Sequence, residues 1–282
     1  MKSPVTRAAL WSLPVLALLL GWAWTNPQGN FWGTVEPPKA QGEAFDATKL
    51  ATVQRPTVDL YAAEKLNRLI REPQNTVSNL AYATVGLALC LAGRRRETYS
   101  LGAASAFLAV GSGLYHASLV PEWRLIDILG VYAVLYCLVV MAAKANWPRL
   151  AAGALGWALD VGAWVLAVTT GIFRNDVRIA GFKVFDSTYV VVAAVALSWL
   201  LVLGVARRQA SPKKYRRAVV GAAFFSAGSF AGGLGDRFGG FWLAPDAFVQ
   251  GHAVWHVLGA FAVLAVYEAL AGSGLYRSTC EH

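Results

Sequence analysis

Residues 99–120, YSLGAASAFLAVGSGLYHASLV, decide the fold. The stretch contains no Asp, Glu, Lys or Arg, and it is long enough to cross a bilayer core, which takes roughly 20 apolar residues in a helix. Near its end stand Ser112 and His116, four residues apart. Polar side chains inside a membrane are costly and are usually functional. The stretch therefore predicts a transmembrane helix that carries part of a functional site.

The composition of the whole chain agrees with a membrane protein. Of its 282 residues, 56% are hydrophobic and 15% are charged, whereas a soluble domain has about 25% charged residues. The net charge of +9 fits the basic cytoplasmic loops of membrane proteins. Since there is no basic module with an aromatic platform, we expect no nucleic-acid partner. The three cysteines show no C-x-x-C spacing, so neither a disulfide framework nor a cysteine zinc site is expected.

The apolar runs of the sequence predict an all-α fold. We expect an integral membrane seven-helix bundle over residues 74–273, with an additional N-terminal transmembrane helix or signal anchor over 1–25. Residues 26–73 form an extramembrane segment whose later part has the spacing of an amphipathic surface helix, and residues 274–282 form a cytoplasmic tail. The runs lie near 8–25, 76–93, 100–120, 125–143, 150–173, 185–206, 217–235 and 250–272.

The orientation of the chain follows from the Lys and Arg residues of its loops, which gather on the cytoplasmic side. One set of loops holds Arg94, Arg95, Arg96, Lys144, Arg149, Arg207, Arg208, Lys213, Lys214, Arg216 and Arg217; the opposite set holds Arg124, Arg174, Arg178, Lys183 and Arg237. The first set is larger and is therefore predicted to be cytoplasmic. The first run resembles a signal peptide, but its cleavage signal is weak, so we favour an uncleaved anchor. Both termini are then cytoplasmic, and residues 26–73 are periplasmic or lumenal.

Three of the four histidines lie in apolar runs, and their positions predict a metal site. His252 and His256 are four residues apart, which places them on one face of a helix. The predicted topology puts His116 at a similar depth on the same outer side of the membrane. Three imidazoles suit zinc with a fourth position left open, and such a site activates water. The alternatives are helix–helix hydrogen bonds or haem ligation, although two histidines on one helix face cannot bind opposite faces of a haem.

Two further polar residues accompany the histidines. Ser112 precedes His116 by one helical turn, and Asp127 lies near the start of the next run on the same outer side. A carboxylate beside a zinc-activated water acts as a general base or acid, and a hydroxyl can hydrogen-bond the developing oxyanion. Two structural alternatives stay open: Ser112 as a small packing residue and Asp127 as a helix cap. Asp160, in a later run, is expected to be a protonated interhelical hydrogen-bond partner.

The combined pattern resembles the alkaline ceramidase family. It consists of S-x-x-x-H ending at His116, an Asp eleven residues later at Asp127, and H-x-x-x-H at 252–256. The segment EPQNTVSNLAY at 72–82 is similar to the E-x-x-N-T-x-S-N entry to the first core helix of that family. The family belongs to a superfamily of seven-helix membrane hydrolases that includes the progestin/adiponectin receptors. The resemblance covers roughly residues 59–272.

The resemblance implies a zinc-dependent amidohydrolase that cuts the N-acyl bond of ceramide-like lipids entering from the bilayer. His116, His252 and His256 would bind zinc, and Ser112 and Asp127 would assist catalysis. The family also implies a calcium site, for which the available oxygen ligands are Asp59, Glu64, Asn67 and Glu72. Two alternatives stay open: a hydrolase of another lipid bond, and a lipid-sensing, receptor-like protein with structural zinc. No particular protein partner is indicated.

Overall fold

The computed structural model of the chain describes residues 68–92, 95–173, 178–179, 182–183, 212–238 and 250–271, together with isolated residues at 21, 197, 200, 201, 203 and 204. The predicted N-terminal anchor, the amphipathic surface helix and the C-terminal tail therefore lie outside the described residues, apart from single positions. The predicted run at 185–206 is described only at isolated residues, so the full number of helices stays a prediction.

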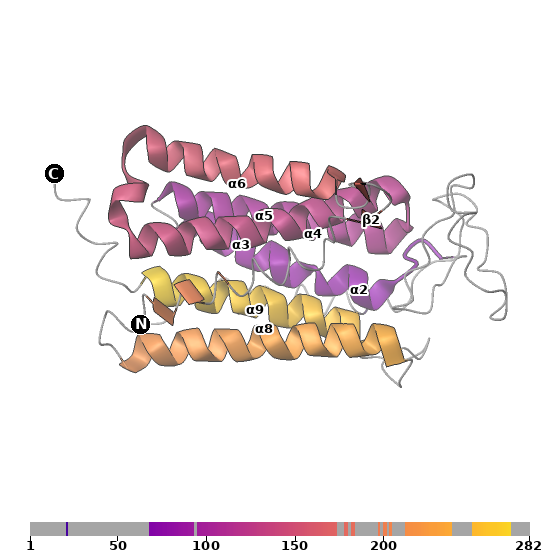
Figure 1. Cartoon of the computed structure of the whole chain (residues 1–282). Coiled ribbons are helices and arrows are strands. Elements are labelled where there is room, and N and C mark those ends of the chain that lie inside the picture. Colours follow the sequence, from indigo (N-terminus) through magenta and orange to yellow (C-terminus); the bar gives the residue numbers. More distant parts are fainter. Residues whose placement is uncertain are drawn as a thin grey trace.

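The described part of the chain confirms the all-α fold, with helices lying side by side along one long axis (Figure 1). The helices in chain order are α2 (Pro73–Ser78), α3 (Leu80–Ala92), α4 (Arg96–Ser118), α5 (Pro121–Asn146), the 3-10 turn η2 (Pro148–Ala151), α6 (Gly153–Phe173), α8 (Pro212–Phe238) and α9 (Gly251–Ala271). A short antiparallel hairpin of β1 (Arg178–Ile179) and β2 (Phe182–Lys183) follows α6. This hairpin was not expected from the sequence.

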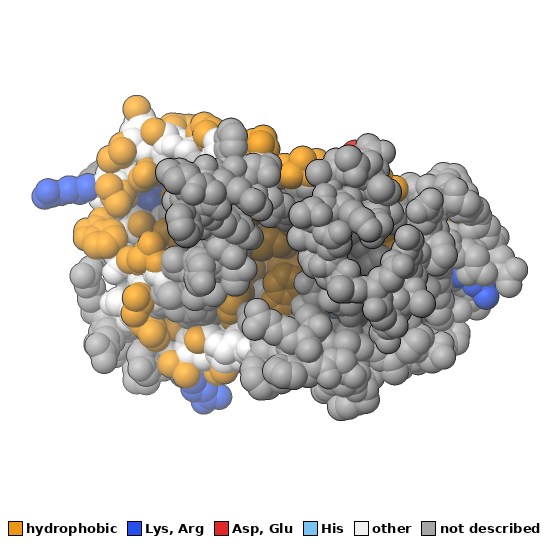
Figure 2. All heavy atoms as spheres, turned by 45° about the vertical axis from the view of Figure 1, so that its right-hand side comes forward, with side chains coloured by type: hydrophobic (Ala, Val, Ile, Leu, Met, Phe, Trp, Pro, Cys, Tyr) orange, Lys and Arg blue, Asp and Glu red, His pale blue; other side chains and the backbone are white. Residues whose placement is uncertain are grey.

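In the part of the chain that the structure describes, three helices are long and apolar enough to cross a membrane: Glu122–Asn146, Gly153–Ile172 and Gly251–Leu270. Helix α6 also turns a row of large hydrophobic side chains outward, namely Leu155, Trp157, Val161, Val165, Leu166, Val168 and Ile172. Hydrophobic side chains crowd the described part of the face in Figure 2. An apolar surface of this kind is unfavourable in water and suits contact with lipid. These helices are those expected of a membrane protein.

Glycines bring α3, α4 and α5 into close contact. A Cβ atom on Gly86 of α3 would lie 2.7 Å from the backbone nitrogen of Ala106 in α4, and one on Gly130 of α5 would lie 2.6 Å from the Cα of Leu108 in α4. Small residues at such crossings allow helix backbones in membranes to approach closely. Helix α4 therefore packs closely against both α3 and α5. This packing fixes the position of its residues along the axis of the bundle.

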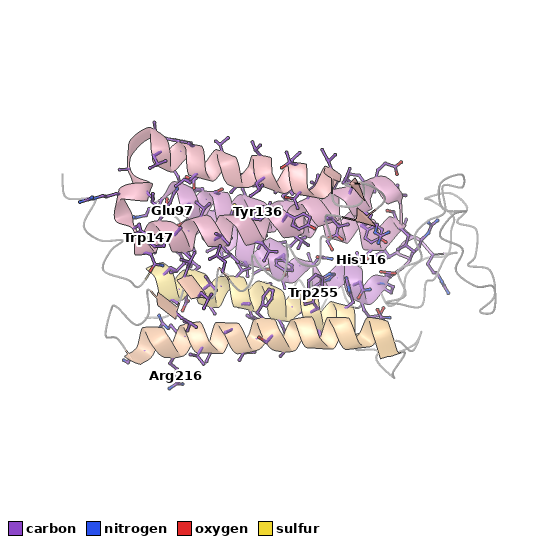
Figure 3. The ribbon with its side chains drawn as sticks, viewed as in Figure 1. Glu97, His116, Tyr136, Trp147, Arg216 and Trp255 are labelled. Carbon is purple, nitrogen blue, oxygen red and sulfur yellow. The ribbon has the colours of Figure 1, made fainter. Side chains whose placement is uncertain are left out.

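The end of the bundle opposite His116 contains a buried ion pair. The Lys144 ammonium donates to Asp160 Oδ1 at 2.6 Å and to the Gly156 carbonyl at 3.0 Å. Two expectations are corrected here: Lys144 lies inside α5 rather than in a loop, and Asp160 pairs with a cation rather than acting as a neutral hydrogen-bond partner. Figure 3 shows Glu97, Trp147 and Arg216 toward this end and His116 and Trp255 toward the other.

Candidate metal centre

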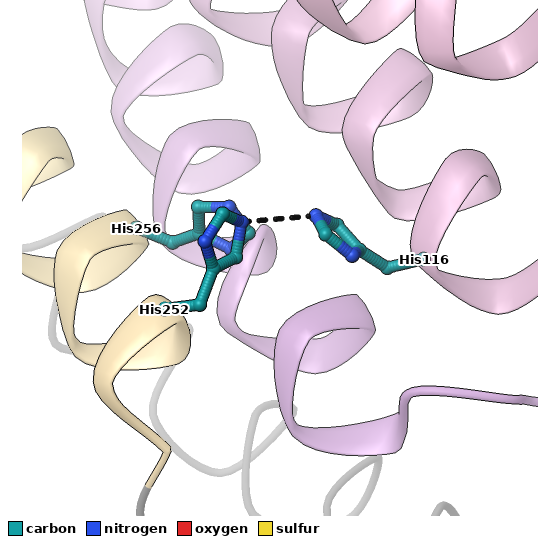
Figure 4. Close-up of side chains that lie close together, drawn as sticks. All are labelled: His116, His252 and His256. Carbon is teal, nitrogen blue, oxygen red and sulfur yellow. Dashed lines mark hydrogen bonds between the residues drawn. The ribbon is translucent and has the colours of Figure 1, made fainter. Parts of the chain in front are cut away.

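The three predicted histidines meet in space between the end of α4 and the start of α9 (Figure 4). His116, His252 and His256 each offer a ring nitrogen, and these atoms all lie within 4.8 Å of one another. The Nε2 atoms of His116 and His252 are 3.2 Å apart. The predicted convergence of two distant segments is therefore confirmed, and the cluster is able to hold a metal ion.

The spacing of the nitrogens suits a tetrahedral zinc ion. Two nitrogens bound at about 2.0–2.1 Å to a tetrahedral zinc are about 3.3 Å apart, close to the 3.2 Å between His116 and His252. The ring centroids of His252 and His256 are 4.5 Å apart, as the i, i+4 spacing on α9 requires. Three imidazoles and no thiolate form a donor set that suits zinc as well as copper, iron and nickel.

Glu72, the residue that precedes α2, holds the ring of His116. Its Oε2 atom lies 2.5 Å from His116 Nδ1 and also accepts from Asn75 Nδ2 at 3.1 Å. Both Glu72 and His116 are buried. The carboxylate accepts a hydrogen bond from the Nδ1–H group of His116. The Nε2 lone pair of the ring then faces the other histidines. Such carboxylate–histidine pairs orient metal ligands and raise their basicity.

Backbone hydrogen bonds fix Glu72 against the end of α4. The Glu72 N–H donates to the His116 carbonyl, and the Arg71 N–H donates to the Ala117 carbonyl, both at 3.0 Å. The Arg71 guanidinium also donates to the Ser118 carbonyl at 2.6 Å. The segment before α2 is therefore bound to the very turn that carries His116.

Ser78, at the end of α2, holds the ring of His256 in a similar way. Its Oγ lies 2.8 Å from His256 Nδ1 and donates its own proton to the Asn75 carbonyl at 2.9 Å. The Ser78 oxygen then accepts a hydrogen bond from the Nδ1–H group of His256. This leaves the Nε2 lone pair of that ring for a metal. Glu72 and Ser78 were missed as histidine partners, although both lie in the EPQNTVSN segment at the depth predicted for the histidines.

Ser112 lies beside the cluster with an unsatisfied hydroxyl. It is fully buried on α4, one turn before His116, and its Oγ has no hydrogen-bond partner among the described residues. A buried polar group left unpaired costs about 1–3 kcal/mol. The hydroxyl is therefore positioned for a group that enters the site.

Asp127 lies on α5, where that helix touches α4. A Cβ atom on Gly111, the neighbour of Ser112, would lie 3.1 Å from the Asp127 backbone nitrogen. The half-buried Asp127 carboxylate also interacts electrostatically with Tyr82 of α3. The Tyr82 hydroxyl lies against Gly259, which follows His256 by three residues on α9. Asp127 is thus placed where α5 adjoins the part of α4 that carries Ser112.

The structure describes only one of the four predicted calcium ligands. Asp59, Glu64 and Asn67 lie outside the described residues. Glu72 Oε2 binds His116 Nδ1, whereas Glu72 Oε1 has no hydrogen-bond partner among the described residues. The calcium site stays a prediction.

Comparison with known families agrees with this geometry. The Ceramidase family matches residues 65–278, which contain all the described residues of the metal centre. No relative among curated proteins matches the chain. The matched region is about three quarters of the sequence, since it covers 214 of 282 residues. The chain therefore belongs to the Ceramidase family.

Proposed function

We propose that the protein is a membrane-embedded, zinc-dependent amidohydrolase that cleaves the N-acyl bond of a ceramide-like lipid into a fatty acid and an amine. The observation that carries the proposal is the histidine cluster of a Ceramidase family member, in which Glu72 and Ser78 orient two of the rings. Oriented neutral imidazoles are what a metal centre requires. A histidine that only formed a hydrogen bond between helices would not need two other histidines beside it.

His116, His252 and His256 would hold the zinc ion. When bound there, zinc would polarise the scissile carbonyl and lower the pKa of its bound water to about 7. The Asp127 carboxylate accepts a proton from the attacking water and then delivers it to the nitrogen of the leaving amine. The Ser112 hydroxyl, which is buried without a partner among the described residues, donates a hydrogen bond to the carbonyl oxygen as its negative charge develops.

The substrate would enter sideways from the bilayer, because the centre lies within the helices near one end of the bundle. We place this end on the periplasmic or lumenal side, with the basic residues near Arg216 on the cytoplasmic side. A calcium ion bound by Asp59, Glu64, Asn67 and Glu72 belongs to the same proposal. The unpartnered Glu72 Oε1 supports it, since calcium takes oxygen ligands.

Elemental analysis of the purified protein, together with its His116→Ala variant, tests the proposal. We expect about one zinc per chain in the wild type and a loss of both zinc and activity in the variant. Activity is measured as release of fatty acid from a panel of N-acyl lipids and of the matched esters. A wild-type protein without zinc would refute the proposal. Zinc without turnover of any lipid would favour the receptor-like alternative, and turnover of esters alone would favour another lipid bond.

A further inference from the structure

Asn79, at the junction of α2 and α3, buries a side-chain oxygen that the proposed reaction has not used. The residue is 2% exposed, and its Nδ2 donates to the Asn75 carbonyl at 2.8 Å. This bond fixes the orientation of the amide group, so its Oδ1 faces away from the Asn75 carbonyl. The Oδ1 atom has no hydrogen-bond partner among the described residues. A buried acceptor of this kind needs a donor, because leaving it unpaired is unfavourable.

The position of Asn79 places it beside the metal centre. Its Cβ lies 3.9 Å from where a Cβ on Gly113 would stand. Gly113 precedes His116 by three residues, so Asn79 packs on the side of α4 that carries His116. The preceding residue, Ser78, contacts His256. Asn79 therefore lies between elements that build the site, and the Ser112 hydroxyl of α4 is also unpartnered among the described residues.

Two of the groups that have no partner among the described residues, Asn79 Oδ1 and the Ser112 hydroxyl, are complementary to an amide bond. The Asn79 carbonyl oxygen only accepts hydrogen bonds, whereas the Ser112 hydroxyl can donate one. A secondary amide offers a carbonyl oxygen to a donor and an N–H to an acceptor. An ester offers the same carbonyl but no N–H, and its bridging oxygen would bring lone pairs toward the Asn79 oxygen. A site built to hydrogen-bond one group discriminates strongly against an analogue that lacks it.

We propose that Asn79 is a specificity-determining residue, whose Oδ1 accepts a hydrogen bond from the N–H of the scissile amide and so selects amides over esters. The inference rests on the proposed function, since it assigns a further contact to the same substrate. It concerns recognition of the bond, and it leaves proton transfer to Asp127.

The test compares Asn79→Leu with the wild type on an N-acyl lipid and on the ester with the same acyl chain. Leucine has a similar volume but offers no acceptor. Asn146→Leu is the matched control, because Asn146 lies at the far end of α5 and donates to the backbone carbonyls of Ala142 and Leu201. For each full-length, zinc-containing protein, kcat/KM is measured with both lipids. The inhibition constant of the ester against the amide gives its binding even where it is not cleaved.

We expect Asn79→Leu to lower kcat/KM for the amide about tenfold or more relative to the ester. Zinc content and the inhibition constant of the ester should stay close to the wild-type values, and Asn146→Leu should leave the amide-to-ester ratio unchanged. An equal loss with both lipids, or no loss with either, would overturn the role of Asn79 while leaving the proposed function intact. A wild-type protein that cleaves no amide would overturn the proposed function itself, and the role of Asn79 with it.

Discussion

The two ends of the bundle both bury ionisable side chains, but they pair them differently. At one end, Lys144 and Asp160 neutralise each other at 2.6 Å. At the other end, Glu72 and Ser78 occupy only the Nδ1 atoms of His116 and His256, so the Nε2 atoms face a shared centre. Ser112 and Asn79 add unpartnered oxygens among the described residues there. The charges at one end are thus compensated within the helices, although Asp160 Oδ2 has no hydrogen-bond partner among the described residues, whereas three histidine ring nitrogens converge at the other end.

The largest predicted effect is a loss of kcat in the variant Asp127→Asn. Asparagine keeps the shape of the side chain but cannot accept and return a proton. We expect kcat to fall by about 10²–10⁴-fold, with zinc content unchanged by elemental analysis. Loss of zinc in this variant would show that Asp127 supports the metal rather than the proton transfer. Full retained activity would remove Asp127 from the mechanism.

The opposite end should respond to mutation with a loss of stability instead. Lys144→Met leaves the buried Asp160 carboxylate without its cation, and breaking such a pair costs about 3–5 kcal/mol. Denaturant unfolding in detergent micelles measures this loss. The double variant Lys144→Met/Asp160→Leu should recover most of it, because both charges are then removed. If the double variant is no more stable than the single one, the pair does not act as a unit.

A smaller effect is expected when the charge behind His116 is removed. Glu72→Gln keeps the size of the side chain but weakens the partner of the imidazole, and we expect zinc affinity to fall about 10–100-fold. Competition with a chelator measures this affinity. Glu97→Gln is the matched control, because Glu97 is also buried but lies at the far end near Arg95. A similar loss of affinity in both variants would contradict a direct role for Glu72.

The smallest effect is expected at Ser78. Ser78→Ala removes a neutral hydrogen bond to His256, so zinc affinity should fall about two- to tenfold. Ser105→Ala provides the comparison, since the Ser105 hydroxyl is buried and donates only to the Leu101 carbonyl of its own helix. Unchanged affinity in Ser78→Ala would mean that the His256 ring is oriented by other contacts.

The sequence predicted the histidine cluster because two simple rules were enough. The i, i+4 spacing placed His252 and His256 on one helix face, and the order of apolar runs placed His116 at the same depth. The partners Glu72 and Ser78 were not predictable in the same way. Their contacts depend on how the short helix α2 packs against the ends of α4 and α9, and no periodicity in the sequence encodes that packing.

The error at the other end has a comparable cause. Counting loop charges assigned Lys144 to a loop, because a lysine was not expected inside an apolar helix. Helix α5 in fact continues to Asn146, and Asp160 on the neighbouring helix compensates the ammonium. Charge patterns in a sequence locate helix ends only when the charges face water. Such patterns do not reveal an ion pair that is buried between two helices, since its two residues are 16 positions apart in the chain.

The bond between Glu72 and His116 also sets an order of assembly. It joins positions 44 residues apart, one just before α2 and the other in α4. His252 follows His116 by 136 residues, on the last described helix. A growing chain can therefore form this bond, which keeps the proton of His116 on Nδ1, before His252 and His256 have been synthesised. A metal site of three histidines would therefore be complete only after α9 has been synthesised.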